Sequence, residues 1–152
     1  MRLLEFIDQK TIIVDLQAVD KKGVLEELAT PLAAAAGIGV ADLVRVLMER
    51  ERLGSTGIGG GIGIPHGKLK KIDTLLMGFG LSRRGVAFDS IDGKPAHLFF
   101  VLITPENSTG LHLKVLARIS RLLKNEPFKE RLKTAADADQ VVQILGEEDE
   151  EF

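Results

Sequence analysis

The sequence contains no cysteine, no tryptophan and no tyrosine, so its seven phenylalanines are its only aromatic residues apart from histidine. Without cysteine the chain forms no disulfide and uses neither a thiolate nucleophile nor a cysteine-ligated zinc. Aromatic residues make up 5% of the chain, which argues against the stacking platforms that bind single-stranded nucleic acid. The missing residue types therefore exclude thiol chemistry and disfavour single-strand recognition.

The chain also lacks an excess of charge and any long hydrophobic run. Its formal net charge is −2 over 152 residues, a balance that does not indicate a nucleic-acid partner. The longest strongly apolar run, Leu98–Ile103, is far shorter than a membrane span. The first residues, Met1–Phe6, include an acid and lack the apolar core of a signal peptide. We therefore expect a cytoplasmic protein that is not inserted into a membrane.

The common nucleotide-binding and zinc-binding motifs are missing too. A P-loop requires a glycine five residues before its Gly-Lys pair and a hydroxyl residue directly after it, but Ile62 and Leu69 occupy these positions around Gly67-Lys68. The dinucleotide fingerprint that would start at Gly57 also fails at Ile62. No His-Glu-x-x-His occurs, and the three histidines lie far apart in the sequence. The sequence therefore predicts neither a bound cofactor nor a metal.

Hydrophobic periodicity indicates that strands and helices alternate. A β-branched run at 12–14, apolar runs at 75–81 and 97–104 and the alternation of Ile62 and Ile64 predict strands, with 97–104 as the central one. Apolar residues at helical spacing predict helices over about 24–36, 42–53, 111–123, 126–132 and 139–145. The expected fold is a single three-layer α/β domain, residues 1–146, with helices on both faces of a mixed sheet of about five strands. An acidic, solvated tail, 147–152, would follow it.

Local signals add details to this expected fold. Pro31 should kink or end its helix. Residues 82–85 should turn the chain so that Val86 and the residues after it pair back as a hairpin or an edge strand. Leu113 is expected on the buried side of its amphipathic helix, and Gly146 should stop the last helix.

Glycine is concentrated in one segment, Gly54–Lys68, which reads Gly-Ser-Thr-Gly-Ile-Gly-Gly-Gly-Ile-Gly-Ile-Pro-His-Gly-Lys. Glycine lets the backbone adopt positive φ and approach another group closely. Pro65 fixes its own φ and keeps the residue before it extended, so His66 stands on a stiff step before Gly67. This arrangement suits a nucleophile that accepts an anionic group. A flexible loop with an exposed histidine is the alternative.

Phosphoryl transfer is the chemistry that fits this segment. Neutral imidazole is a good nucleophile near its ordinary pKa of about 6.5, and phosphoryl transfer requires mainly positioning and charge stabilisation. His66 would accept the phosphoryl group, with Arg50 supplying charge and the glycine-rich backbone supplying N–H donors. Thr56 or Ser55 would contribute a hydroxyl, and His112 would hydrogen-bond the phosphoryl oxygens.

Each of the partner residues also has a structural interpretation. Arg50 lies in the run Glu49–Arg52, which is typical of a solvated helix face with favourable ion pairs. His112 follows a polar loop at the start of a helix, a place that suits a capping or surface residue. His97 begins the most hydrophobic segment, and we expect it to be structural. Only the combination of these residues favours phosphoryl chemistry.

This combination resembles the signature of phosphotransferase-system (PTS) enzyme IIA domains of the fructose/mannitol type. The resemblance covers most of the chain, from about residue 20 to about residue 145. The matching segments are Glu49-Arg50-Glu51 directly before the glycines, Gly54–Lys68, Val86–Gly93, His97–Thr104 and Leu111–Ala117.

The resemblance implies a role for each candidate residue. In that family the histidine of the Pro-His-Gly step receives the phosphoryl group, and this role falls on His66. The second active-site histidine falls on His112 and the active-site arginine on Arg50. A hydroxyl position of the same motif falls on Thr56. The family fold is a three-layer arrangement with a mixed sheet between helices, as the hydrophobic pattern also predicts.

The resemblance also implies partners. The donor would be the histidine-containing phosphocarrier protein or its nitrogen-branch counterpart, and the acceptor a regulated target protein or a IIB domain. Because the sequence has no IIB-like cysteine motif and no membrane-spanning IIC part, it most resembles the free-standing nitrogen-regulatory IIA proteins, which act on partners according to their phosphorylation state. Stand-alone IIA components of sugar uptake have the same layout, so that branch is an alternative.

Two other classes of function stand beside the phosphocarrier. One is a pure protein-interaction module, in which the glycine-rich segment is a docking surface and His66 is incidental. The other is a hydrolase with His66 as general base, which ranks last because no convincing nucleophile or metal set accompanies it. The sequence leaves open which ring nitrogen of His66 would be phosphorylated, since that depends on the partner of the other nitrogen.

Overall fold

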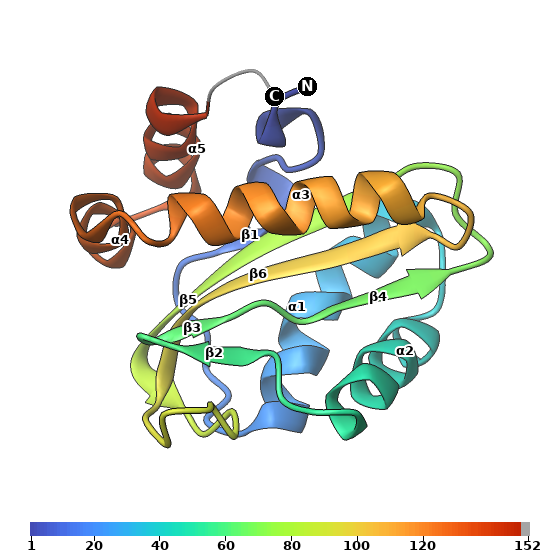
Figure 1. The fold of residues 1–152 in the computed structure, drawn as a ribbon, viewed down its shortest axis with the longest axis horizontal. Helices are drawn as coiled ribbons and strands as arrows, with labels where there is room; N and C mark the ends of the chain where they lie inside the picture. The colour runs from blue at the N-terminus through green and yellow to red at the C-terminus, as the bar shows by residue number, and fades with distance from the viewer. Residues whose placement is uncertain (150–152) are drawn as a thin grey trace.

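The structure is a computed structural model that describes residues 1–149 as three layers (Figure 1). A six-stranded mixed sheet has the order β1-β5-β6-β3-β2, and β4 also pairs with β6. The expected α/β fold with one mixed sheet between helices is confirmed, with six strands instead of about five. The strands are β1 (Ile12–Ile13), β2 (Gly57–Gly59), β3 (Ile62–Gly63), β4 (His66–Leu69), β5 (Leu76–Val86) and β6 (Ala96–Pro105).

Five α-helices occur in the part of the chain that the structure describes, and they divide between the two faces of the sheet (Figure 1). The first two pack on one face, and the last three pack on the other. The helices are α1 (Lys21–Ala36), α2 (Val40–Arg52), α3 (Thr109–Leu122), α4 (Glu126–Lys133) and α5 (Ala138–Glu148).

Strand β6 supplies both hydrophobic cores because its side chains alternate between the faces of the sheet. Leu98, Phe100 and Leu102 belong to the core under α3, α4 and α5. Phe99, Val101 and Ile103 belong to the core under α1 and α2. All six side chains are buried, so β6 is the central strand that its continuous apolar sequence predicts.

Helix α1 begins and ends at the residues that its capping signals indicate. The side chain of Asp20 accepts a hydrogen bond from the Gly23 backbone N–H, and Gly37 ends the helix in the left-handed conformation. Pro31 does not end α1, which continues to Ala36. Leu28 and Leu32, on either side of the proline, are buried in the core against the sheet, and this packing outweighs the missing backbone hydrogen bond.

The expected turn at residues 82–85 is wrong. Strand β5 continues to Val86, which pairs with Ala96 of β6. The extra residues are absorbed as a register shift between Leu81 and Val86, where Gly85 has a φ of 94° and its N–H donates to the Ser82 hydroxyl. A bulge of this kind keeps the strand paired while it bends, so local turn residues did not produce a hairpin.

Three other local expectations are corrected in the C-terminal part of the chain. Leu113 is 61% exposed and does not lie on the buried side of α3. Gly146 does not stop α5, which reaches Glu148. Asp149, expected in the solvated tail, is buried, because its carboxylate accepts the backbone N–H groups of Leu3 and Leu4 at 3.0 Å each. The remainder of that tail, 150–152, lies outside the described residues.

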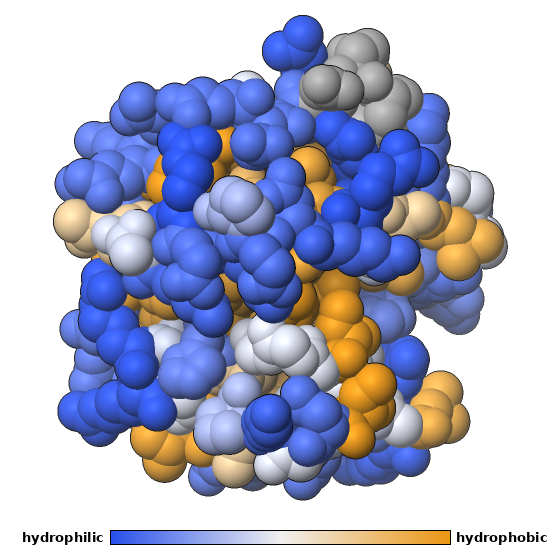
Figure 2. Space-filling model, turned by 60° about the vertical axis from the view of Figure 1, so that its left-hand side comes forward, coloured by the Kyte–Doolittle hydropathy of each residue, from blue (hydrophilic) through white to orange (hydrophobic). Residues whose placement is uncertain are grey.

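The surface seen in Figure 2 is mainly hydrophilic, and its apolar side chains form small separate patches. This distribution is what the burial of the apolar residues in two cores predicts. Among residues 1–149, no helix combines the length and the apolar character that crossing a membrane requires.

Gly57→Ala is expected to lower the free energy of unfolding by about 3 kcal/mol. A Cβ atom at Gly57 would lie 2.5 Å from the Ser90 hydroxyl and 2.9 Å from the Ser90 Cα. The second contact is with backbone, so a side-chain rotation cannot relieve it. In thermal unfolding the midpoint should fall by roughly 10 °C.

Gly110→Ala is the matched control for this substitution. Gly110 lies in the first turn of α3, and a Cβ there would meet no heavy atom within 4 Å. Alanine should therefore leave the stability unchanged or raise it slightly, because glycine is the poorer helix former. Equal unfolding midpoints for the two variants would contradict the packing argument.

Candidate functional site

His66 is the first residue of β4, and the Pro-His-Gly step holds it beside the central strand. His66 pairs in parallel with Leu102 of β6, and the Pro65 carbonyl accepts the Leu102 N–H at 3.0 Å. A Cβ at Gly67 would lie 2.5 Å from Val46 Cγ1 of α2. Glycine therefore lets α2 lie directly against this strand, and the C-terminal end of α2 comes to the His66 ring.

The two ring nitrogens of His66 have different partners. Nδ1 lies 2.7 Å from the Ile64 carbonyl oxygen, and because a carbonyl only accepts, Nδ1 carries the proton. Nε2 therefore holds the lone pair, and Arg50 Nε donates to it at 3.3 Å. Arg50 is held in place by a second hydrogen bond, from Nη1 to the Gly54 carbonyl at 2.9 Å. The pair places an uncharged nucleophile next to a cation.

Burial lowers the pKa of His66 below its ordinary value. The Ile64 carbonyl opposes this shift, the Arg50 charge adds to it, and the Glu51 charge opposes it. The net direction keeps the imidazole neutral at pH 7, since its ordinary pKa is about 6.5. A neutral ring with its lone pair on Nε2 is the form that attacks an electrophile.

His112 lies next to His66, although the two residues are far apart in the sequence. The ring centroids are 5.3 Å apart, with the planes tilted by 56°. His112 is only 6% exposed, so its interpretation as a surface residue is wrong. Its Nδ1 lies 2.7 Å from the Thr104 hydroxyl of β6. Burial, the His66 ring and the Lys68 charge lower the pKa of His112 to about 4.

Lys68 is a charged residue of this site that the sequence analysis missed. Its Nζ donates to the Thr109 hydroxyl at 2.8 Å and so ties β4 to the first residue of α3. Strand alternation places residues two apart on the same side, and Lys68 follows His66 by two. This spacing was the signal that could have identified it.

Thr56 lies beside α2, but its polar groups contact Glu51. The Thr56 hydroxyl donates to the Glu51 carboxylate in a short hydrogen bond, and the Thr56 N–H donates to the same carboxylate at 3.0 Å. Glu51 is buried and also pairs with Lys21 at 2.9 Å, so it does not lie on a solvated helix face. The role of Thr56 toward a phosphoryl group stays a prediction. The other candidate hydroxyl, Ser55, donates to the Phe88 carbonyl at 2.8 Å.

Several N–H groups of the glycine-rich segment are committed to partners other than His66. The N–H groups of Gly54, Thr56, Gly57 and Gly60 all donate to acceptors within the chain. The turn between β2 and β3 lies beside Leu98, the partner of Ile62, whereas His66 lies beside Leu102. Four residues of strand correspond to about 13 Å. The positive-φ glycines of that turn build a hairpin, so the turn does not supply donors to His66. N–H donation by the rest of the segment stays a prediction.

Comparison with known proteins shows the family to which the chain belongs. The family model described as phosphoenolpyruvate-dependent sugar phosphotransferase system, EIIA 2, matches residues 5–148. The chain belongs to this family. The resemblance seen in the sequence is therefore confirmed, together with the phosphotransferase-system function of a IIA component. The individual roles of His66, His112, Arg50 and Thr56 stay predictions.

Similar proteins include a nitrogen regulatory protein and a longer fructose-specific component. This IIA chain is 37% identical over 146 residues to the nitrogen regulatory protein of Bradyrhizobium diazoefficiens, covering 96% of this chain and 95% of that one. It is 33% identical over 150 residues to the fructose-specific EIIABC component of Bacillus subtilis, covering 98% of this chain and 24% of that one. The crystal structure of nitrogen regulatory protein IIA-Ntr from Neisseria meningitidis has a TM-score of 0.88 at 37% identity, covering 93% and 97% of the two chains.

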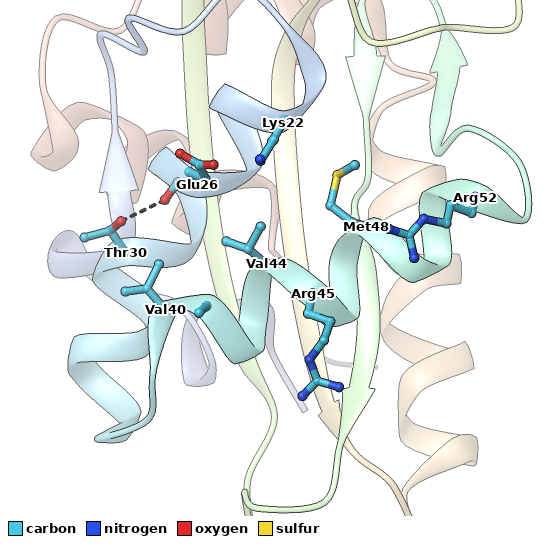
Figure 3. A pocket seen from close by; sticks show the side chains of 9 residues that line it. Lys22, Glu26, Thr30, Val40, Val44, Arg45, Met48 and Arg52 are labelled. Atoms are coloured by element: carbon cyan, nitrogen blue, oxygen red, sulfur yellow. Dashed lines mark hydrogen bonds between the residues drawn. The ribbon is translucent and has the colours of Figure 1, made fainter.

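The IIA chain also has a surface groove that is separate from the histidines. The groove has a volume of about 630 Å³ and lies between α1 and α2. Figure 3 shows Val40, Val44 and Met48 of α2 along it, with charged side chains at its edge. Neither His66 nor Arg50 lines this groove. Within residues 1–149, no three histidine or carboxylate side chains gather as a metal site would require.

The free energy of unfolding of the IIA chain is expected to fall as the pH drops from about 6.5 to about 4, through His112. In this window the unfolded chain binds more protons than the folded chain, because folding lowers the His112 pKa, so stability rises with pH. One pKa unit corresponds to about 1.4 kcal/mol. The contribution is therefore up to about 3 kcal/mol above pH 6.5 and is lost by pH 4.

Urea unfolding at several pH values, for wild type and His112→Gln, measures this contribution. Carboxylates titrate in both proteins, so the difference between the two isolates the imidazole. The variant should lose less stability than wild type on acidification. Parallel curves for the two proteins would show that burial of His112 does not disfavour its protonation.

Proposed function

We propose that this IIA protein carries a phosphoryl group on Nε2 of His66, accepted from a histidine-containing phosphocarrier protein of the general or the nitrogen branch. The observation that carries the proposal is the hydrogen bond of Nδ1 to the Ile64 carbonyl, which keeps the ring proton on Nδ1 and the nucleophilic lone pair on Nε2, beside Arg50. The Nε2–phosphorus bond forms as the nitrogen–phosphorus bond of the donor histidine breaks, and its electron pair returns to the donor ring. Nδ1 of His66 keeps its proton throughout.

The neighbouring side chains support a charged phosphoryl group at this position. Arg50 Nε points at Nε2 in the free protein, so the guanidinium is already where phosphoryl oxygens would arrive. His112, with its ring 5.3 Å from that of His66, lies close enough to hydrogen-bond those oxygens. Lys68, which lowers the His112 pKa by its charge, adds a second cation. Preorganised donors and charges of this kind are the main source of catalysis in phosphoryl transfer.

We infer further that the protein acts as a regulatory IIA of the nitrogen type. The nitrogen regulatory relative from Bradyrhizobium diazoefficiens matches this chain over nearly the whole length of both. The fructose-specific relative is about four times longer than its matched part. A phosphoryl group adds up to about two negative charges beside Arg50, which switches a docking surface for a target protein. The target protein therefore reads the phosphorylation state of His66.

Intact-protein mass after incubation with phosphoenolpyruvate, enzyme I and each phosphocarrier tests the proposal. We expect a gain of one acid-labile phosphoryl group, with the nitrogen-branch carrier as the faster donor. Ring ¹⁵N–³¹P coupling in the labelled product should place the group on Nε2 of a histidine. No gain with either carrier would leave the interaction module as the better account, and attachment to Nδ1 would overturn the assignment from the Ile64 hydrogen bond.

A further inference from the structure

We propose that the Thr104 hydroxyl fixes His112 in the tautomer that carries its proton on Nε2, so that His112 is a hydrogen-bond donor toward a phosphoryl group on His66. Thr104 is thus a positioning residue that acts through His112. The catalytic part of this inference rests on the proposed function, whereas the tautomer itself is a property of the unphosphorylated protein.

Thr104 is held rigidly at the position where it meets the imidazole. It lies near the end of β6, is fully buried with 0% exposure, and pairs in register with Lys68 of β4. Its hydroxyl oxygen lies 2.7 Å from His112 Nδ1. Among the described residues, the partner of the Thr104 hydroxyl is His112 Nδ1.

The choice between the two tautomers follows from the proton of that hydroxyl. If Nδ1 of His112 carried the ring proton, Nδ1 would donate to Thr104, and the hydroxyl proton would be left in the core without an acceptor. A buried donor without an acceptor lowers the stability of the folded protein. If Nε2 carries the proton, Nδ1 accepts from the hydroxyl and both groups are satisfied. Nδ1 can accept this hydrogen bond only if the imidazole is neutral, which is the form that the lowered pKa of His112 favours.

The two histidines are then held in opposite tautomers by two different partners. The Ile64 carbonyl accepts from Nδ1 of His66 and leaves a lone pair on its Nε2. The Thr104 hydroxyl donates to Nδ1 of His112 and leaves an N–H on its Nε2. The first ring is therefore a nucleophile and the second a donor for phosphoryl oxygens. In the other tautomer, His112 would present a lone pair to those anionic oxygens and repel them.

Ring ¹⁵N spectra of the unphosphorylated protein near neutral pH test the tautomer directly. We compare wild type with Thr104→Val, which removes the hydroxyl, and Thr104→Ser, which restores it. Wild type and Thr104→Ser should show His112 protonated on Nε2, and Thr104→Val should show a mixture. A wild-type His112 protonated on Nδ1, or a Thr104→Val spectrum like that of wild type, would overturn the inference.

Thr11→Val is the matched control. Thr11 is also buried, but its hydroxyl lies 3.0 Å from the Met77 carbonyl, away from both histidines. This variant should keep the wild-type His112 signals. A change in His112 on removal of the Thr11 hydroxyl would mean that any loss of core packing moves the tautomer, and the inference would fail.

The initial rate of phosphoryl uptake tests the consequence. We expect Thr104→Val to be slower by about threefold to tenfold at saturating donor, the effect of one hydrogen bond, with an unchanged KM. Thr104→Ser should be within about twofold of wild type. Equal rates for wild type and Thr104→Val would overturn the positioning role. If wild type itself takes up no phosphoryl group, the proposed function fails, and the ¹⁵N spectra still decide the tautomer.

Discussion

His66→Ala is expected to take up no phosphoryl group at all, while its fold remains intact. The variant loses the Nε2 atom, which holds a lone pair directly beside the Arg50 cation. His66 is half-buried and belongs to neither hydrophobic core, so truncation removes few core contacts. Intact mass and ³²P incorporation from phosphoenolpyruvate measure the uptake. Amide spectra of the same sample establish that the variant is folded.

His97→Gln is the control for this experiment, since it removes another half-buried imidazole from the same protein. His97 Nδ1 lies 2.9 Å from the Ser82 carbonyl, and its residue lies at the opposite end of β6 from the partner of His66. This variant should be phosphorylated like wild type. Phosphoryl uptake by a folded His66→Ala protein would move the acceptor to another residue and end the proposed role of His66.

Arg50→Ala is expected to slow phosphoryl uptake on the order of 100-fold, because it removes a preorganised charge from the reacting group. Two hydrogen bonds hold the Arg50 guanidinium in place, from Nε to His66 Nε2 and from Nη1 to the Gly54 carbonyl. Its absence would also raise the pKa of His66, since its charge contributes to lowering it. Arg50→Lys should recover only part of the rate, because an ammonium lacks the planar fork of donors.

Arg52→Ala is the control for this prediction. It removes one positive charge from α2, as Arg50→Ala does, but at a position that does not contact His66. Arg52 lies on the same helix two residues later and lines the groove between α1 and α2 (Figure 3). Rapid-mixing measurements of the transfer rate should find Arg52→Ala close to wild type. A similar loss in both variants would mean that overall surface charge, and not the contact with His66, determines the rate.

The sequence was sufficient for most of the fold because its patterns are local and strong. The continuous apolar run of β6 predicts a central strand, and Asn125 with the following proline predicts the start of α4, where the Asn125 side chain accepts the Phe128 N–H. The expectation failed at β5, where pairing with a long neighbouring strand outweighed the turn residues around Gly85. It also failed at Asp149, whose burial depends on backbone N–H groups at the other end of the chain.

The candidate site was also predicted only in part: the sequence indicated its residues, but not how they come together. The Pro-His-Gly step identified His66 from its own neighbours in the sequence. Phosphoryl chemistry suggested Arg50 and His112, and the resemblance gave them the same roles. Their proximity arises from packing of α2 and α3 against β4 and β6, with Gly67 allowing the close approach of α2. Glu51 shows what the sequence could not predict. Its run of alternating charges indicates a solvated helix face, yet Glu51 is buried and pairs with Lys21.

The sequence by itself determined the family, the α/β class and the one imidazole on a stiff step. These features depend on residue type and on spacing within a short segment, where sterics and hydrophobic periodicity act. Only the tertiary structure decided which nitrogen of His66 carries the proton, which hydroxyl contacts His112, and that the glycine turn lies away from His66. Hydrogen-bond partners and burial are set by residues distant in the chain, and these partners fix the tautomers and the pKa values on which the chemistry depends.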